Sequence, residues 1–182
     1  AIGVLWAGRG TRWGRGPTLL LLALAFSWLG DGAAVFFPEL PELPTMLACF
    51  GLAHLAYIWL FVRAIAERSL PPWTLVYAVW WGVLLALLFP RLGALTVAVA
   101  IYGALLATTA ATAARAGSLV AVGGAFFLAS DTLLAFRLFT PEAMPEFTSP
   151  LVMLSYTLGQ GLIAAGAMRS VRARDLRSAD VA

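Results

Sequence analysis

The sequence predicts an all-α protein, a polytopic bundle of transmembrane helices. Hydrophobic residues fill 62% of the 182 positions and charged residues only 12%, whereas soluble domains carry about 45–50% and about 25%. Six stretches stay apolar for roughly the 20 residues that a helix needs to cross the hydrocarbon core. Runs such as LLLLALAF also lack the alternation of apolar and polar residues that marks membrane β-strands. We therefore expect an integral membrane protein with a single helical domain over residues 1–182.

The five connections between the six predicted helices contain turn-forming residues. In order, they contain PELPELP, RSLPP, FPR, RAG and TPEAMPE. Their expected bounds are 17–37, 44–62, 73–89, 92–114, 118–139 and 147–168, with a basic tail over 169–182. Because the connections are short, neighbouring helices must be antiparallel and adjacent. The opening AIGVLWAG is typical of the end of a preceding helix, so we expect that the true N-terminus, with one or more helices, is missing.

The arginines orient the predicted bundle. Ten of them fall on one side, namely Arg9, Arg12, Arg15, Arg63, Arg68, Arg115, Arg169, Arg172, Arg174 and Arg177. The connections on the opposite side hold Glu39, Glu42, Glu142 and Glu146, with Arg91 as their one cation. Cytoplasmic loops of membrane proteins are enriched in Lys and Arg, so we expect the ten-arginine side, including the tail, in the cytoplasm. The bias toward Arg and Ala is typical of a GC-rich bacterial genome and favours a bacterial inner membrane.

Two aspartates interrupt the apolar runs at matching depth. Asp31 lies 14 residues beyond Pro17 in FSWLGDGAAVFF, and Asp131 lies 13 residues beyond Ser118 in AFFLASDTLLAFRLF. At about 1.5 Å per residue, both lie about 20 Å from the cytoplasmic end, in the outer half of the bilayer. A charge at mid-bilayer costs about 2.5–3.5 kcal/mol, so such residues face the bundle interior and usually mark a site. The structural alternative is a helix–helix hydrogen bond to a Ser, Thr or Tyr.

Further polar side chains share the predicted membrane spans. His54 lies near the middle of its helix, and Tyr57 shares its face at i+3. Tyr156 and Gln160, four residues apart, also share a face and indicate a polar cavity wall. With one histidine and one cysteine in the chain, a zinc site is not expected, because such sites normally combine several of these ligands.

Arg137 lies six residues past Asp131, near the outer interface, and two roles fit it equally. One is snorkelling of the guanidinium to the headgroups, and the other is a clamp on the phosphate of a lipid headgroup.

Several function classes lack support. The sequence contains no G-x-S-x-G, no H-E-x-x-H and no P-loop, so serine-hydrolase and ATPase interpretations have no basis. It also shows no basic and aromatic pattern typical of nucleic-acid binding, so we expect no nucleic-acid partner.

Four segments resemble, in order, the signature segments of the YhhN-like lysoplasmalogenase family. They are FSWLGDGAAVFF, GLAHLAYIWLF, GGAFFLASDTLLAFRLF and SYTLGQGLI, and the resemblance runs from about Pro17 to Ala165. Members of this family have usually eight membrane helices and hydrolyse the vinyl ether bond of lysoplasmalogens. The family's preceding Lys-Pro segment is absent here, and AFRLF stands where many members have an Asn-Arg-Phe version, a change that keeps Arg137.

This resemblance implies an ether hydrolase with Asp31 and Asp131 as catalytic residues. It implies substrate-binding or supporting roles for His54, Tyr57, Ser130, Arg137, Tyr156 and Gln160. One carboxylic acid would protonate the vinyl ether, and the other, ionised, would stabilise the cation and orient water; no metal or organic cofactor is required. The implied partners are lysoplasmalogen and membrane lipids. The sequence does not say which aspartate is the acid, whether choline or ethanolamine is preferred, or whether the protein is a homo-oligomer.

Two other functions fit the same residues. A proton-coupled carrier of lipids or small molecules would use buried Asp and His side chains as its proton relay. A non-catalytic lipid-binding or assembly protein would hold both aspartates in hydrogen bonds with no cavity beside them.

Overall fold

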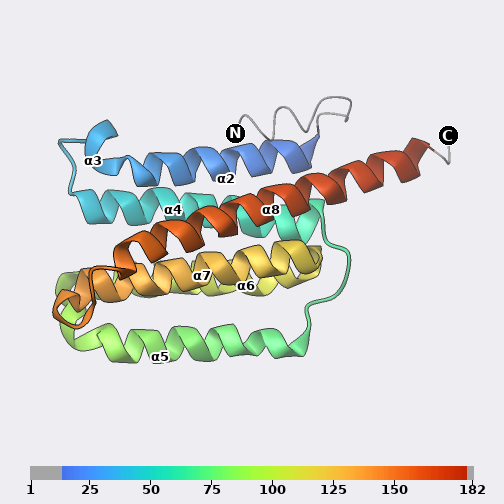
Figure 1. Cartoon of the computed structure of the whole chain (residues 1–182). Coiled ribbons are helices and arrows are strands. Elements are labelled where there is room, and N and C mark those ends of the chain that lie inside the picture. Colours follow the sequence, from blue (N-terminus) through green and yellow to red (C-terminus); the bar gives the residue numbers. More distant parts are fainter. Residues whose placement is uncertain (1–13, 180–182) are drawn as a thin grey trace.

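The described part of the chain is a bundle of antiparallel helices (Figure 1). The computed structural model describes residues 14–179, and within them it contains helices and no strands. The six long helices are α2 (Arg15–Asp31), α4 (Glu42–Trp59), α5 (Leu75–Leu92), α6 (Thr96–Ala113), α7 (Ser118–Phe139) and α8 (Thr148–Ala179). The predicted all-α fold class with six helices is therefore confirmed. The helix end expected at AIGVLWAG, Arg9, Arg12 and the last residues of the tail lie outside the described residues.

Four helical segments of the described chain are long and apolar enough to cross a membrane. They are Glu42–Ala64, Pro72–Ala116, Ser118–Phe139 and Thr148–Arg177. The second comprises both α5 and α6, which turn back on each other at Gly93, a residue with a φ of 51°. Such a positive φ suits glycine, because it has no Cβ. These spans identify an integral membrane protein.

The first predicted helix does not run unbroken to residue 37. α2 ends at Asp31, and after Gly32 the chain forms the short helix α3 (Ala33–Phe36). Glycine is a weak helix former, and here it also makes room, since a Cβ on Gly32 would lie 2.4 Å from the Phe36 ring. Asp31 is therefore the last residue of a helix rather than a residue within a continuous span.

The last predicted helix continues well beyond residue 168. α8 extends to Ala179, so residues 169–179 of the expected tail are helical. Contacts with the segment after α4 accompany this extension: Arg174 donates hydrogen bonds to the carbonyls of Ala64 and Ala66, and the Ser170 hydroxyl donates to Glu67 at 2.8 Å. A polar helix end that finds partners on the bundle is stabilised by tertiary contacts rather than by its own propensity.

The arginine-bearing connections meet at one end of the bundle. Arg68 donates to the carbonyl of Ala114 at 2.7 Å, and Arg115 donates to the carbonyl of Arg68 at 3.1 Å. At the other end, Arg91 lies 3.8 Å from Glu142. The structure thus separates the arginine-rich connections from the acidic ones, as the alternation along the sequence requires.

α5 is the helix least embedded in the bundle (Figure 1). Only Leu88 and Leu92 among its residues are buried, and its outer face carries exposed Val79, Val83 and Leu87. Pro90 lies in its last turn, which is why the sequence placed the helix end at residue 89.

The closest helix contact joins α7 to α8. A Cβ placed on Gly123 would lie 2.8 Å from the backbone nitrogen of Ile163 and 2.9 Å from the carbonyl oxygen of Gly159. A Cβ on Gly159 would in turn lie 2.8 Å from the nitrogen of Phe127. Small residues let membrane helices approach backbone to backbone, and here they bring α8 against the middle of α7.

Replacing Gly159 by alanine should therefore destabilise the protein. The new Cβ would press on backbone atoms, which cannot rotate away, and overpacking of this kind costs about 1–3 kcal/mol. The matched control is Gly161→Ala, because a Cβ there meets nothing within 4 Å and alanine is the better helix former. Thermal unfolding in detergent should show a lower Tm for Gly159→Ala only; equal Tm values for the two variants would contradict this packing.

Candidate active site

Polar side chains from five helices meet in the middle of the bundle. They form two hydrogen-bonded chains, and each chain ends at one of the two aspartates. The first joins α7, α6 and α4, and the second joins α2, α8 and α4.

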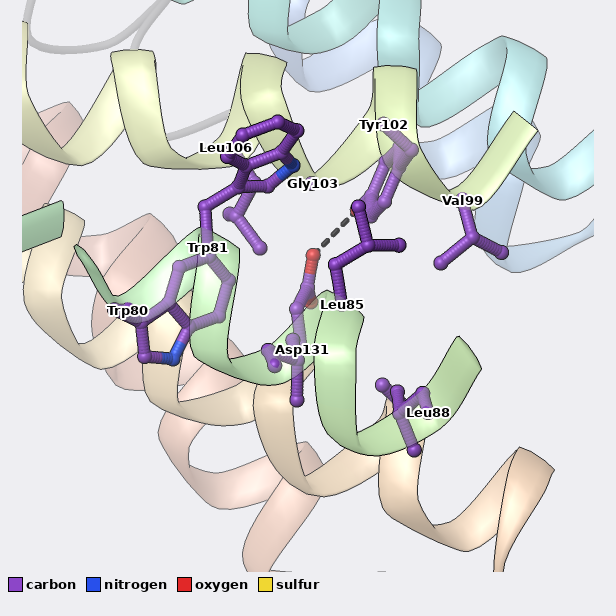
Figure 2. A pocket seen from close by; sticks show the side chains of 11 residues that line it. Trp80, Trp81, Leu85, Leu88, Val99, Tyr102, Gly103, Leu106 and Asp131 are labelled. Atoms are coloured by element: carbon purple, nitrogen blue, oxygen red, sulfur yellow. Dashed lines mark hydrogen bonds between the residues drawn. The ribbon is translucent and has the colours of Figure 1, made fainter. Parts of the chain in front are cut away.

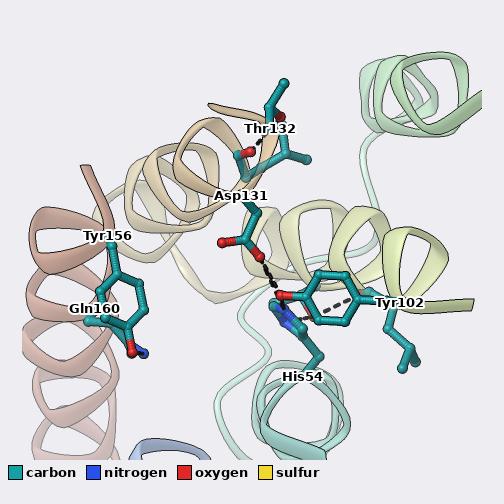
Figure 3. Close-up of polar contacts among 9 residues, drawn as sticks. His54, Tyr102, Asp131, Thr132, Tyr156 and Gln160 are labelled. Atoms are coloured by element: carbon teal, nitrogen blue, oxygen red, sulfur yellow. Dashed lines mark hydrogen bonds and ion pairs between the residues drawn. The ribbon is translucent and has the colours of Figure 1, made fainter. Parts of the chain in front are cut away.

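The first chain begins at Asp131 (Figure 3). The hydroxyl of Tyr102 donates a hydrogen bond to Oδ2 of Asp131 and lies 3.3 Å from Nε2 of His54. The other ring nitrogen of His54, Nδ1, lies 3.1 Å from Oγ1 of Thr109. The Thr109 hydroxyl donates to the carbonyl oxygen of Leu105, one turn earlier in α6, at 2.9 Å. His54 and Thr109 are buried, so this chain is enclosed by protein.

The second chain begins at Asp31. The hydroxyl of Tyr156 donates to Oδ2 of Asp31 at 2.8 Å, and the Gln160 amide donates to the Tyr156 oxygen at 3.2 Å. The hydroxyl of Tyr57 donates to the carbonyl oxygen of Gln160. Four of the side chains singled out in the sequence therefore form one continuous hydrogen-bonded set.

The ring of Phe127 lies between the two chains. It is fully buried, and its centroid lies 5.1 Å from that of His54, 5.4 Å from that of Tyr156 and 6.3 Å from that of Tyr57, all edge to face. Edge-to-face contacts of this kind are favourable for aromatic rings. One side chain of α7 thus fixes the spacing of both chains.

The two carboxyl groups end separate hydrogen-bonded chains, Asp131 through Tyr102 and Asp31 through Tyr156. Their surroundings differ. The side chain of Asp131 is 9% exposed and lies inside the bundle, whereas Asp31 is the last residue of α2 and is exposed. The two groups thus lie in different environments.

Two small apolar cavities flank Asp131. One, of about 40 Å³, lies between α5, α6 and α7 and is lined by Trp80, Trp81, Gly103 and Leu106 among others (Figure 2). The other, of about 50 Å³, lies between α4, α6 and α7, toward the end of the bundle that carries the α7–α8 connection. Both are lined by Val99, Tyr102, Asp131 and Ala135. The Asp131 carboxyl group therefore faces apolar space on both sides.

Hydrogen bonds alone would fit a purely structural pair of aspartates, since each accepts one from a tyrosine of another helix. The structural interpretation expects no cavity beside the aspartates, and two small cavities adjoin Asp131.

Two of the candidate residues have other contacts. Ser130 donates to the carbonyl of Val152 at 2.9 Å and so joins α7 to α8. Arg137 donates to Thr148 Oγ1 at 2.6 Å and to the carbonyl of Pro145 at 3.3 Å, so its guanidinium lies against the α7–α8 connection.

Three residues of the site were not predicted from the sequence, namely Tyr102, Thr109 and Phe127. Tyr102 and Thr109 are seven residues apart and so share one face of α6, which is a signal that the sequence contains. That this face meets His54 depends on the packing of α6 against α4, and no local pattern encodes it. Phe127 looks like any other phenylalanine of an apolar helix.

The second chain should contribute to stability. Tyr57→Phe removes the buried hydroxyl that bonds to Gln160 and leaves the half-buried amide oxygen without this donor. Hydrogen bonds inside membrane proteins contribute about 0.6 kcal/mol on average and up to about 1.7 kcal/mol. We expect a loss in that range in unfolding by denaturant, and no loss for the control Tyr77→Phe, whose hydroxyl has no hydrogen-bond partner within residues 14–179. Equal stability of the two variants would contradict the contact.

Comparison with known proteins agrees with the residue pattern. The model of the YhhN family matches residues 1–167, which include both aspartates and every residue of the two chains. No curated protein and no solved structure gives a match to this chain. A match over so much of the sequence shows that the chain belongs to the YhhN family.

Proposed function

We propose that this protein is a membrane lysoplasmalogenase, which hydrolyses the vinyl ether bond of lysoplasmalogen. The observation that carries this proposal is the presence of two intramembrane carboxyl groups in different settings, since Asp131 lies against apolar cavities and Asp31 lies at the exposed end of α2. Membership of the YhhN family supports it.

The reaction requires an acid and water. Protonation of the β-carbon of the vinyl ether gives an oxocarbenium ion, and addition of water to this ion releases a proton and forms a hemiacetal. The hemiacetal then breaks its bond to the glycerol oxygen and gives a fatty aldehyde and a glycerophospho-alcohol. Glycosidases meet a related demand with two carboxyl groups in different protonation states.

We assign the acid to Asp131 and the ionised group to Asp31. A lipid chain that passes through the two cavities would carry its double bond past the Asp131 carboxyl group. Asp31, at the more exposed position, would orient the attacking water and stabilise the positive charge. Tyr156 and Gln160 would hold Asp31 in place through the hydrogen bonds that they make.

The substrate would lie along the bundle with its headgroup at the α7–α8 end. The vinyl ether is next to the glycerol, so a double bond at Asp131 would direct the first carbons of the chain into the small cavity beside Trp80 and Trp81. Arg137 is six residues, or about 9 Å, further along α7 toward that end. Its charge would attract the phosphate of the headgroup.

Removal of either carboxyl group should abolish the reaction. We expect Asp31→Asn and Asp131→Asn to release no fatty aldehyde from lysoplasmalogen, as measured by mass spectrometry, while the protein remains folded by its Tm. Glu146→Gln, a change to an exposed carboxylate in the α7–α8 connection, should keep full activity and serves as the matched control. Full turnover by either aspartate variant would contradict the catalytic role proposed for that residue. Substrate flux in proteoliposomes without aldehyde would favour a proton-coupled carrier.

A larger residue at position 135 should exclude the chain. Ala135 lines both cavities, so Ala135→Leu would fill space beside Asp131 in each of them. We expect kcat/KM for a long-chain lysoplasmalogen to fall at least about tenfold, since the loss of a buried chain contact of about 1.4 kcal/mol corresponds to that factor. Ala129→Leu, at an exposed position on the same helix, is the matched control and should retain wild-type kinetics. Unchanged kcat/KM in Ala135→Leu would place the chain elsewhere.

A further inference from the structure

We infer that His54, Tyr102 and Asp131 share one mobile proton, which Tyr102 passes between the carboxyl group and the imidazole. The inference starts from the hydrogen-bond directions in the first chain and needs no assumption about the reaction. Its catalytic consequence rests on the proposed function.

Thr109 determines which nitrogen of His54 carries a hydrogen. A hydroxyl group has one hydrogen to donate, and that of Thr109 goes to the Leu105 carbonyl at 2.9 Å. Oγ1 of Thr109 can then only accept from the ring nitrogen 3.1 Å away. In this arrangement Nδ1 of His54 bears a hydrogen, and the other tautomer would require Thr109 to turn its hydrogen from the Leu105 carbonyl to Nδ1.

Tyr102 then has to satisfy two neighbours with a single hydrogen. Its oxygen lies between Oδ2 of Asp131 and Nε2 of His54. If Asp131 is ionised, the Tyr102 hydrogen points to the carboxylate, and Nε2 needs a hydrogen of its own, so His54 is an imidazolium. If His54 is neutral, Tyr102 donates to Nε2, and Asp131 must be a carboxylic acid that donates to the Tyr102 oxygen.

Both arrangements contain the same number of protons. The alternative with one proton fewer, a neutral His54 beside an ionised Asp131, would turn the lone pair of Nε2 toward the lone pairs of the Tyr102 oxygen. An unmade hydrogen bond between buried groups costs about 1–3 kcal/mol, so the chain favours the extra proton. This proton changes place when the hydrogen of Asp131 moves to Tyr102 while that of Tyr102 moves to Nε2, and Tyr102 is neutral before and after.

The chain ends inside the protein. His54 and Thr109 are buried, and beyond Thr109 the chain stops at the Leu105 carbonyl, which cannot pass a proton on. The described contacts thus make a proton store attached to Asp131 rather than a path across the membrane.

In the proposed reaction, the shared proton keeps Asp131 available as a carboxylic acid before each turnover. When Asp131 gives its proton to the β-carbon, the three residues are left in the arrangement with facing lone pairs. The proton that water releases on adding to the oxocarbenium ion returns to Asp131 and restores the chain. Tyr102 and His54 are positioning residues in this cycle, since they act on the substrate only through Asp131.

The protein offers a direct probe, because His54 is its one histidine. In protein labelled with ¹⁵N-histidine and purified without a histidine tag, the two ring-nitrogen signals report on His54 alone. We expect Nδ1 to be protonated in the wild type. Tyr102→Phe should shift the Nε2 signal and leave Nδ1 in place, whereas Thr109→Val should shift Nδ1.

Matched variants separate the relay from general effects on folding. Thr108→Val removes a hydroxyl that also bonds to a carbonyl of its own helix but is exposed, and it should change neither signal. Asp131→Asn, which cannot hold the proton, should leave His54 neutral with Nε2 as an acceptor from Tyr102. An unprotonated Nδ1 in the wild type, or an unchanged Nε2 signal in Tyr102→Phe, would overturn the inference.

Kinetics then test the catalytic consequence. Tyr102→Phe should lower kcat for aldehyde release by at least about tenfold, within the range of general acid–base effects, with KM within about twofold. An unchanged kcat together with the expected NMR shifts would overturn the role in catalysis and leave the shared proton in place. If wild-type protein releases no aldehyde, the proposed function fails, and the NMR result still decides on the shared proton.

Discussion

The backbone contact between α7 and α8 at Gly123 and Gly159 is the constraint on which the site depends. It brings the Gly159 backbone against the nitrogen of Phe127, whose ring separates the two hydrogen-bonded chains. It also sets the positions of Tyr156 and Gln160 along the bundle axis relative to Asp131. A side chain at either glycine would push the helices apart and move the phenol that holds Asp31 away from Asp131. Packing and chemistry are thus set by the same pair of residues.

Much of this arrangement could be predicted from the sequence. Long apolar runs predict membrane helices, and turn-forming residues predict where the helices end. The cost of a carboxylate in lipid singled out Asp31 and Asp131 for the same reason. The break at Gly32 was missed because two glycines in an apolar run do not by themselves end a helix, and here the space is taken by the rings of Phe36 and Phe50. Tyr102 was missed because its role exists only when α6 packs on α4, and such contacts between helices are not encoded in local patterns.

The two aspartates are similar in sequence and different in setting. Each accepts a hydrogen bond from one tyrosine, and each tyrosine lies on a helix other than that of its aspartate. Tyr156 is hydrogen-bonded to the neutral amide of Gln160, whereas Tyr102 is hydrogen-bonded to the imidazole of His54, which can take up a proton. The second group in each chain, rather than the carboxyl group or its phenol, therefore makes the two ends chemically unequal. A reaction that needs one acid and one anion can use such a pair without a metal ion.

The position of α5 at the edge of the bundle affects which concentration of a lipid substrate would govern occupancy of the site. This helix forms one wall of the cavity beside Asp131, while its outer face is apolar and exposed. If the proposed function holds, a lipid chain that reaches Asp131 along this wall leaves the bilayer without passing through water. Occupancy of the site is then governed by the mole fraction of the lipid in the surrounding leaflet rather than by its concentration in bulk solution. Dilution with inert lipid would lower the rate at constant total substrate, which is the surface-dilution behaviour of interfacial enzymes.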